Sequence, residues 1–463
     1  MRRNSSASRL RTLLAFSHHA LYQFPAISLI SENFSHMDVT VVGGGLAGMA
    51  ASIHLARGGL KVLCVETDPQ DTDPVGESLD WSAPGLLAAF DLSMDRLIRD
   101  GIATYKRHVI LKLRSGAQQD YTPGKWLADP PFNVELRTMH VDRTLLNRAL
   151  REIFLAAGVT LLRDRVVNAT RHRRRITAVE TEGGVKIQSR WYIDASGSAV
   201  SLFPRLFELP TFEYGPRKIA MWDYFSVPES IEGTTLNADC DGPRYMSWVW
   251  QIPINPNTLS VGYIASGETI KEKRQDGMNV PEIFAEQLES YSGLRALIQS
   301  PRELSPRTTS FVCRVHAKTS GPNWLVIGES AAMVDPMTSN GVTAALRHAE
   351  EASRLILRSR HREQLPWLSR TLYARRVLDM ATFFNEGIEK AIYDWPIRNR
   401  IGLLAAGDVY TIPAWSINNI YSRVQPNGVI TTFLFSLVLS TLRASLNLFY
   451  WFCKRSQPAG ATS

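Results

Sequence analysis

The sequence predicts an α/β fold in which a strand–turn–helix–strand unit is joined to an antiparallel sheet and to a helical C-terminal region. Three observations favour this class. A glycine-rich turn lies between two short apolar runs, residues 205–268 are rich in the aromatic and β-branched side chains typical of strands, and long helices are expected between residues 341 and 392. At 463 residues the chain is long enough to bury a large core, and two lobes are expected.

The glycine-rich turn has the spacing G-x-G-x-x-G, formed by Gly43, Gly45 and Gly48. In a dinucleotide-binding unit the first glycine permits a tight turn, the second lets the backbone approach a pyrophosphate, and the third lets the helix pack closely on the strand. Free N–H groups and a partial positive charge at the start of the next helix would bind the phosphates. Because a lone glycine pattern is a weak signal, the flanking segments decide its meaning.

The segments around the turn have the expected types and order. Residues 39–42 predict a buried strand, residues 49–57 a helix that ends at two glycines, and residues 61–65 a second strand. Glu66 follows this second strand and is placed to accept hydrogen bonds from a ribose. Because all these parts are in register, the stretch predicts a Rossmann-like dinucleotide site.

The later elements follow from apolar runs and from turn-forming residues. Helices are predicted at residues 83–92, 144–157 and 280–299, and one strand at residues 102–113. The sheet predicted at residues 205–268 is expected to roof a substrate pocket. Further strands are predicted at residues 159–163, 165–170, 176–181, 185–190 and 324–327, and long helices at residues 341–358 and 365–392.

Cysteine content and charge exclude several classes of protein. The four cysteines form no C-x-x-C pair, which argues against a disulfide framework and a zinc site and suits a reducing, cytoplasmic compartment. The net charge of +8 lies in the two ends of the chain, because residues 1–36 sum to +3, residues 396–463 to +5, and the body between them to zero. A nucleic-acid partner would need a basic body, so the pattern favours contact with an anionic membrane surface instead.

The two ends are interpreted separately. Residues 1–36 are rich in Arg and Ser, and a disordered extension is preferred over a targeting segment because Met37 directly precedes the first strand. Residues 429–452 are apolar with a single charge. A helix lying on a membrane, a helix packed on its own protein and a spanning helix all remain open, although an arginine within the helix disfavours spanning. The polar residues of this segment form one narrow stripe: Ser436, Ser440, Arg443 and Asn447.

Three later stretches match one known architecture. They are Asp194 in Y-I-D-A-S-G, the segment 328–336, and Arg143 at the start of a helix. Behind a G-x-G-x-x-G turn, this order resembles the group of FAD enzymes that includes aromatic hydroxylases, geranylgeranyl reductases and flavin-dependent halogenases. The resemblance implies a Rossmann-like FAD-binding domain, with Glu329 where the group usually has Asp. The residues that it assigns to FAD are Gly43, Gly45, Gly48, Glu66, Arg143, Asp194, Gly328 and Glu329.

The stretch 247–253 narrows the resemblance. It contains Trp248 and Trp250 in the pattern W-x-W-x-I-P, which is similar to the signature of flavin-dependent halogenases. Side chains two residues apart on a strand point to the same face. The resemblance implies that these rings separate the flavin from the substrate, so that halide intercepts a flavin hydroperoxide before it hydroxylates an aromatic ring. A pair of core tryptophans is the structural alternative.

Two more segments resemble halogenase motifs. Residues 75–78 are similar to V-G-E-[AS], and residues 335–341 are similar to D-P-L-x-S-x-G. The second resemblance implies that backbone N–H groups near Asn340 and Gly341 bind halide, an anion at a helix N-terminus. Thr338 stands where the tryptophan-specific branch has a Glu, which disfavours free tryptophan and favours a phenolic or pyrrolic substrate.

Lys106 lies where halogenases have a lysine that delivers hypohalous acid to the substrate. An amine in a mostly apolar tunnel has a lowered pKa and reacts as a nucleophile, which suits this role. A solvated strand lysine is the structural alternative, and Arg107 and Lys112 are competing cations.

The implied reaction is FADH2- and O2-dependent halogenation, by a halide ion, of an electron-rich aromatic small molecule, free or tethered to a carrier protein. The chain has no second G-x-G-x-x-G, so a separate flavin reductase is expected to supply FADH2. The alternatives are reduction of polyprenyl double bonds, as in geranylgeranyl reductases, an FAD-dependent monooxygenase, and a flavoprotein without catalysis.

Four parts of the chain are expected. They are an N-terminal extension, an FAD-binding domain, an inserted substrate-binding sheet region, and a helical C-terminal region with the apolar segment. Their expected residues are, in that order, 1–36; 37–100, 140–204 and 310–355; 101–139 and 205–309; and 356–463.

Overall fold

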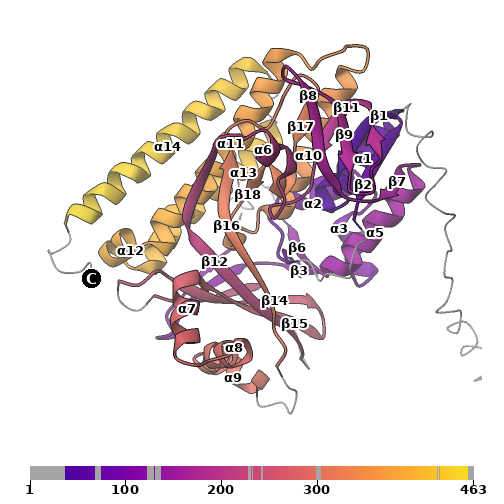
Figure 1. Cartoon of the computed structure of the whole chain (residues 1–463). Coiled ribbons are helices and arrows are strands. Elements are labelled where there is room, and N and C mark those ends of the chain that lie inside the picture. Colours follow the sequence, from indigo (N-terminus) through magenta and orange to yellow (C-terminus); the bar gives the residue numbers. More distant parts are fainter. Residues whose placement is uncertain are drawn as a thin grey trace, which may run out of the picture.

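The structure is a computed structural model. It describes residues 37–456, apart from 68–74, 123–129, 131–136, 228–230, 232, 241–242, 299–303, 425 and 427. The extension predicted at residues 1–36 lies outside the described residues. Figure 1 shows the N-terminal unit on one side of the molecule, a long twisted sheet below it, and long helices along the other side.

A five-stranded parallel sheet is built around β1 (Met37–Val42), in the order β17-β11-β1-β2-β7. Helix α1 (Leu46–Arg57) packs against α5 (Arg143–Ala156) and α10 (Gly341–Arg358). Because helices cover the sheet, β1 is buried and apolar, as the sequence predicts. The other strands are β2 (Val62–Glu66), β7 (Thr160–Arg163), β11 (Ser189–Asp194) and β17 (Trp324–Val326).

An eight-stranded sheet forms the second layer, in the order β18-β16-β12-β15-β14-β13-β4-β5, and only its β13–β4 pair is parallel. The boundary predicted at residues 309 and 310 lies within β16. The antiparallel sheet expected from residues 205–268 is confirmed as part of this layer. Its strands are β4 (Val109–Leu113), β5 (Gln118–Tyr121), β12 (Thr211–Ser226), β13 (Thr234–Asp239), β14 (Ser247–Asn255), β15 (Thr258–Ser266), β16 (Arg307–His316) and β18 (Ala332–Met333).

The two faces of this sheet bury different partners. Along β14, Val249 packs with α8 (Val280–Glu289), whereas its neighbours Trp248 and Trp250 point to the opposite face and pack with the C-terminal helices. The predicted common direction of the two tryptophans is therefore confirmed. The remaining helices on the α8 side are α7 (Gly267–Gln275) and α9 (Ser292–Ile298).

The single strand predicted at residues 102–113 is wrong. The structure divides it into β3 (Ala103–Lys106), which pairs with β6 (Thr138–Val141), and β4, which joins the eight-stranded sheet. A side-chain pattern of period two identifies strand residues but does not determine which sheet they join. The smaller elements are α2 (Ala83–Ala88), α3 (Met94–Arg99), β8 (Val166–His172), β9 (Arg175–Thr181), β10 (Lys186–Ile187), α6 (Leu202–Leu206), η2 (Gly328–Ser330) and η3 (Pro336–Thr338).

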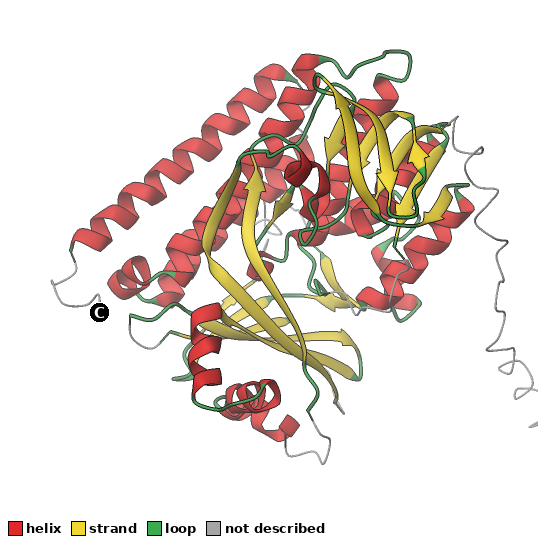
Figure 2. Cartoon of the chain, viewed as in Figure 1, coloured by secondary structure: helices red, strands yellow, loops and turns green. Residues whose placement is uncertain are grey.

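The C-terminal region is helical, as predicted, and Figure 2 shows its helices grouped beside the eight-stranded sheet. A π-helical turn, η4 (Glu389–Tyr393), follows α11 directly and turns the acidic side chain of Glu389 towards the sheet. The other helices are α11 (Trp367–Ile388), α12 (Trp395–Ile401), α13 (Leu403–Val424) and α14 (Val429–Arg455).

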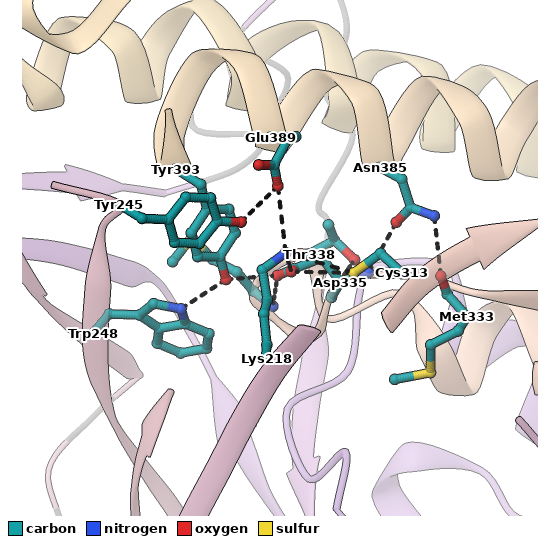
Figure 3. A network of polar contacts seen from close by, with 11 residues as sticks. Lys218, Tyr245, Trp248, Cys313, Met333, Asp335, Thr338, Asn385, Glu389 and Tyr393 are labelled. Atoms are coloured by element: carbon teal, nitrogen blue, oxygen red, sulfur yellow. Dashed lines mark hydrogen bonds and ion pairs between the residues drawn. The ribbon is translucent and has the colours of Figure 1, made fainter. Parts of the chain in front are cut away.

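A buried ion pair joins these layers (Figure 3). Lys218 on β12 lies 3.1 Å from the Asp335 carboxylate and 3.4 Å from that of Glu389, and the side chains of Lys218 and Asp335 are at most 1% exposed. A bulge in β12 between Tyr214 and Lys218 brings Gly215 beside Glu389, where a Cβ would collide with the carboxylate. Burial alone would lower the pKa of Lys218, but the negative charges of Asp335 and Glu389 outweigh it and raise the pKa.

Hydrogen bonds extend this pair in two directions (Figure 3). The Tyr393 hydroxyl donates to Asp335, and the Trp248 indole N–H donates in turn to the Tyr393 hydroxyl at 2.8 Å. On the other side the side-chain amide oxygen of Asn385 accepts a hydrogen bond from the backbone N–H of Asp335. The segment that begins at Asp335 is therefore fixed by β12, β14, α11 and η4 together.

Replacing Lys218 with Met is expected to lower the free energy of unfolding by about 3–5 kcal/mol, because the Asp335 carboxylate stays buried without its cation. Urea denaturation of purified protein measures the change. Lys186→Met is the control, since Lys186 forms only a half-exposed, 4.0 Å pair with Glu180 and its loss is expected to cost about 0.5 kcal/mol or less. Equal stabilities of the two variants would contradict a stabilising role for the buried pair.

Candidate active site

The turn after β1 forms a cradle at the N-terminus of α1. Gly43 has φ +98°, and a Cβ on Gly48 would lie 1.9 Å from the Gly43 carbonyl oxygen, so both positions need glycine. At Gly45 no described atom lies within 4 Å of an added Cβ, and Gly45 caps α1 without a side-chain hydrogen bond. Gly45 is exposed, and the first N–H groups of a helix have no partner within it, so the start of α1 fits a pyrophosphate.

Two acidic residues predicted to bind the cofactor differ in surroundings. Glu66, at the end of β2, accepts a hydrogen bond from the Gly44 backbone N–H and lies beside the cradle. Asp194 is fully buried at the end of β11, where it accepts from the backbone N–H groups of Ser196 and Phe203. Asp194 therefore fastens the turn that packs on Gly43, while Glu66 lies closer to where a ribose would bind.

The late motif and Arg143 converge on the same region. Gly328 has φ +58°, and Glu329 after it is exposed and accepts from the Ser198 hydroxyl. Arg143 is buried at the start of α5 and donates to the carbonyl oxygens of Val75 and Gly76, which holds the segment 75–78 in place. Burial lowers the pKa of Arg143, while the negative charges of Glu329 and Glu77 oppose this shift.

Buried polar atoms beside this segment lack partners in the described part of the chain. They are Oε1 of Glu77 and Nε of Arg143. Burial raises the pKa of Glu77 to about 7, against hydrogen bonds from Ser260 and Tyr224. Unpaired buried polar atoms are costly, so a polar ligand is expected next to them. Together with the open cradle, these residues fit FAD.

Lys106 lies at the end of β3 and is 3% exposed. Its ammonium nitrogen is 2.8 Å from the Leu79 carbonyl oxygen, 3.4 Å from the Ser339 hydroxyl and 4.9 Å from the Trp81 ring centroid. Burial lowers its pKa to about 7, and the nearby Asp80 carboxylate opposes this shift. The structure therefore brings the predicted lysine and the predicted halide segment into contact, although 233 residues separate them. Arg107 is exposed, and Lys112 lies on β4.

The predicted halide residues lie where η3 meets α10. Ser339 has φ +54°, and the Asn340 backbone N–H donates to the Thr338 hydroxyl at 3.3 Å. Asn340 caps α10 without a side-chain hydrogen bond, and Gly341 is the first residue of this helix. The start of α10 thus offers backbone N–H groups close to Lys106.

The sequence interpretation missed several residues that lie around Lys106. Asp80 is buried and accepts from the Ser82 backbone N–H at 2.6 Å and from the Asn418 amide of α13 at 3.3 Å. The rings of Trp81 and Trp415 lie 4.8 Å apart. Asp80 and Trp81 come two and three residues after the segment 75–78, so extending that motif along the chain would have found them, whereas no motif marks α13.

Two cavities lie where α13 meets α10. One of about 230 Å³ is lined by α2, α10 and α13, with Ser82, Arg347 and Ser422 among its residues. A smaller one, about 30 Å³, has Asn340, Arg347 and Asn418 in its lining. The cavities therefore approach the halide segment and the surroundings of Asp80.

The two predicted tryptophans lie side by side on β14, with their ring centroids 5.9 Å apart, but they contact different groups. Trp248 is linked through Tyr393 to Asp335. Trp250 covers Gly262 and donates its indole N–H to the Ser260 hydroxyl at 3.1 Å, and Ser260 in turn acts on Glu77. Both rings are buried in the core between the eight-stranded sheet and the C-terminal helices.

Known proteins resemble this chain in both sequence and fold. A family model described as tryptophan halogenase matches residues 136–366, and one described as FAD dependent oxidoreductase matches residues 38–203. The flavin-dependent halogenase armH5 of Armillaria mellea is 29% identical over 339 residues, which is 69% of this chain and 64% of armH5. The tryptophan 2-halogenase of Chondromyces crocatus is 25% identical and is matched over 78% of this chain and 70% of its own length. The crystal structure of halogenase PltM has a TM-score of 0.70 at 14% identity, covering 92% of this chain and 93% of PltM.

The fold and the cofactor cradle define an FAD-dependent oxidoreductase. Within that class, the family model and the curated relatives support the flavin-dependent halogenase family. The predicted fold class and the resemblance are thereby confirmed. The chain spans about two thirds of the length of the curated relatives named here, 64% of armH5 and 70% of the tryptophan 2-halogenase.

Gly45→Ala is expected to weaken FAD binding by about tenfold or more without loss of the fold, because the added methyl group would occupy the open cradle at α1. Gly45 has φ −67°, which alanine adopts without strain. FAD titration followed by fluorescence measures the dissociation constant. The control is Gly85→Ala in α2, where an added Cβ also meets no described atom. The same FAD affinity in both variants would place the pyrophosphate elsewhere.

The stability of the protein is expected to depend on pH through Lys106. Because burial lowers its pKa from 10.5 to about 7, the unfolded chain binds more protons between these values, and the wild type gains stability as the pH rises from about 7 to 10.5. Below pH 7 the burial of the charged amine fully opposes folding. The stability difference between wild type and Lys106→Met, measured by urea denaturation, should follow this rise. A difference that is constant with pH would mean that Lys106 stays charged in the fold.

Proposed function

We propose that this protein halogenates an electron-rich aromatic small molecule, phenolic or pyrrolic, and that Lys106 delivers the halogen as hypohalous acid. The observation that supports this most is the buried Lys106 amine, 3.4 Å from Ser339 in the proposed halide segment. Lys218 is paired with two carboxylates, whereas the Lys106 nitrogen contacts a carbonyl oxygen, a hydroxyl and an aromatic ring, and the charge of the nearby Asp80 only partly offsets the effect of burial on its pKa.

FAD binding is assigned to the cradle at Gly43, Gly45 and Gly48 and to Glu66, with Arg143 and Glu329 near the late motif. Asp194 and Gly328 shape the turns around them. When bound, FAD reduced by a separate flavin reductase would supply the two electrons that bring O2 to the peroxide level, and this oxidant would take two electrons from the halide to give hypohalous acid and water. At the proposed FAD site, the role of the protein is to exclude water and to keep the buried side chains of Glu77 and Arg143 in place.

Halide binding is proposed at Asn340 and Gly341. The partial positive charge at the start of α10 and its backbone N–H groups suit an anion. The segment is held by Asp335, whose carboxylate accepts from the Met337 backbone N–H at 3.0 Å. Trp248 and Trp250 act as rigid supports of this segment and of Glu77, and they fit the separation of cofactor from substrate that the family resemblance implies.

The lysine step needs a neutral amine, and a pKa of about 7 makes half of the amine neutral near neutral pH. A neutral Lys106 would hold hypohalous acid by a hydrogen bond, the halogen would bond to a ring carbon, and that carbon's proton would leave with the hydroxide as water. Trp81 and Trp415 offer aromatic surface for the substrate ring beside the amine.

The substrate class rests on Thr338 and on the chemistry of the step. Electrophilic halogen requires an electron-rich ring, and Thr338 supplies no carboxylate to direct attack on free tryptophan. A relative from Pseudomonas fluorescens is named 1H-pyrrole-2-carbonyl (peptidyl-carrier protein) chlorinase, which is compatible with a carrier-tethered substrate here.

Lys106→Met is expected to lower the halogenation rate by about 100-fold or more while FAD binding is unchanged, because the side chain keeps its size but loses the amine. The assay contains purified protein, FAD, a flavin reductase, O2 and bromide, with brominated monochlorodimedone and a phenol as readouts. Bromination of monochlorodimedone reports released hypobromous acid. Because free hypobromous acid also brominates phenols, the phenol is assayed with excess methionine, which consumes the released acid, so that the bromophenol still formed reports directed delivery.

Lys112→Met is the control for this prediction, because Lys112 lies on the adjacent strand β4 and belongs to no proposed step. It should keep the wild-type rate. Full phenol bromination by Lys106→Met would rule out the proposed role of the lysine, and the absence of any bromination by the wild type would contradict the proposed function.

A further inference from the structure

Helix α14 turns its polar side towards the protein. Arg443 donates to Glu386 of α11 at 2.7 Å, and Ser436 donates to the Asp379 carboxylate. Burial alone would raise the pKa of Glu386, but hydrogen bonds from Lys390 and Arg443 outweigh it and lower the pKa. The other contacts of this side are Arg376 to Thr432, Lys390 to Asn447, and Tyr450 to Asp394.

The opposite side of α14 is exposed and is apolar towards both ends of the helix, whereas the exposed residues in its middle are Ser440, Thr441, Ala444 and Ser445. Ile430 is 74% exposed, and large apolar side chains recur from there to Val438 at spacings of three and four residues, which is the period of one helix face, and again from Leu448 to Phe452. Figure 1 shows α14 along the outer edge of the molecule, on the side away from the N-terminal unit. The exposed apolar residues are Val429, Ile430, Phe433, Leu434, Leu437, Val438, Leu448, Trp451 and Phe452. We name this set the outer face of α14.

Charge distinguishes between two partners that could cover this face, a second copy of the chain and a lipid surface. The outer face ends at two exposed cations, Lys454 and Arg455, and the sequence after Asp408 contains no acidic residue. A second copy of the chain would therefore offer no carboxylate from this helix to pair with them. An anionic lipid surface offers both an apolar layer and negative headgroups, and it favours a tryptophan such as Trp451 at its boundary.

The contacts of the polar side fix the orientation of the helix. By length and composition alone, α14 could cross a membrane. Its apolar 18-residue stretch has a mean hydropathy of 1.7, and 22% of that stretch is buried. A spanning helix would have to give up the contacts of Arg443 with Glu386 and of Ser436 with Asp379. The helix must therefore lie parallel to the membrane plane while it stays packed on α11.

We propose that the outer face of α14 lies in the surface of an anionic lipid membrane and attaches the folded enzyme to it. The Ser436, Arg443 and Asn447 side chains remain paired with the protein, and Lys454 and Arg455 contact lipid phosphates. The proposal does not depend on the halogenation reaction, and its test uses no activity measurement.

The test is flotation of the full-length, FAD-bound protein with phosphatidylcholine vesicles, with or without phosphatidylglycerol. The wild type is expected to float with the anionic vesicles, less with phosphatidylcholine alone, and to be released by alkaline carbonate. Leu434→Glu with Leu437→Glu is expected to reduce the bound fraction by about tenfold, because two charges enter the outer face. Leu155→Glu on α5 is the matched control, since Leu155 is 54% exposed and Leu437 52%. It should float as the wild type does.

A second double variant keeps the test valid if Leu434→Glu with Leu437→Glu misfolds. Lys454→Gln with Arg455→Gln alters only exposed side chains and is expected to remove most of the preference for phosphatidylglycerol. The proposal is overturned if the wild type does not bind anionic vesicles, or if both double variants bind as the wild type does. Resistance to carbonate extraction would indicate a spanning helix instead. A dimer in ultracentrifugation that Leu437→Glu dissociates would assign the outer face to a second copy.

Discussion

The buried ion pair between Lys218 and Asp335 is the constraint on which the arrangement of the candidate site depends. Neither charge is stable in the core alone, so the strand that carries the lysine and the segment that begins with the aspartate must stay together. Glu389 adds the C-terminal helices to the same pair. The segment that leads to Asn340 is thus attached at its start to three layers of the fold, and its position relative to Lys106 follows from that attachment.

Two buried lysines in this chain show how surroundings divide structural from chemical roles. Carboxylates raise the pKa of Lys218, so it stays charged and holds the layers together. Lys106 meets a carbonyl oxygen, a hydroxyl and an aromatic ring, and its burial lowers the pKa to about 7, which leaves a reactive amine. The same residue type thus serves as an anchor in one place and as a candidate catalyst in the other. The difference lies in which groups the fold places around each nitrogen.

Local sequence patterns predicted those parts of the fold that depend on neighbours in the chain. The glycine turn, the helix after it and the strand ending at Glu66 agree with the structure because spacing alone determines them. The strand predicted at residues 102–113 was wrong for the same reason, since its pattern is local while sheet membership is not. Contacts between distant segments, such as Asp80 with Asn418, had no local signal at all. The candidate lysine was found through a family resemblance, whereas Trp81 beside it and Trp415, which packs on Trp81, were not.

The outer face of α14 illustrates how the interior of a protein determines what its surface presents. Composition revealed an apolar segment with a polar stripe but not the direction of that stripe. In the structure, the surface that α14 covers carries three acidic residues, Asp379 and Glu386 on α11 and Asp394 at the N-cap of α12. Partly buried carboxylates require hydrogen-bond donors. Three residues of the polar stripe, Ser436, Arg443 and Asn447, therefore turn inward, whereas Ser440 is exposed. Because the charged residue of the stripe is used inside, large apolar side chains face outward towards both ends of the helix, and this lipid-compatible surface is a consequence of charge pairing within the fold.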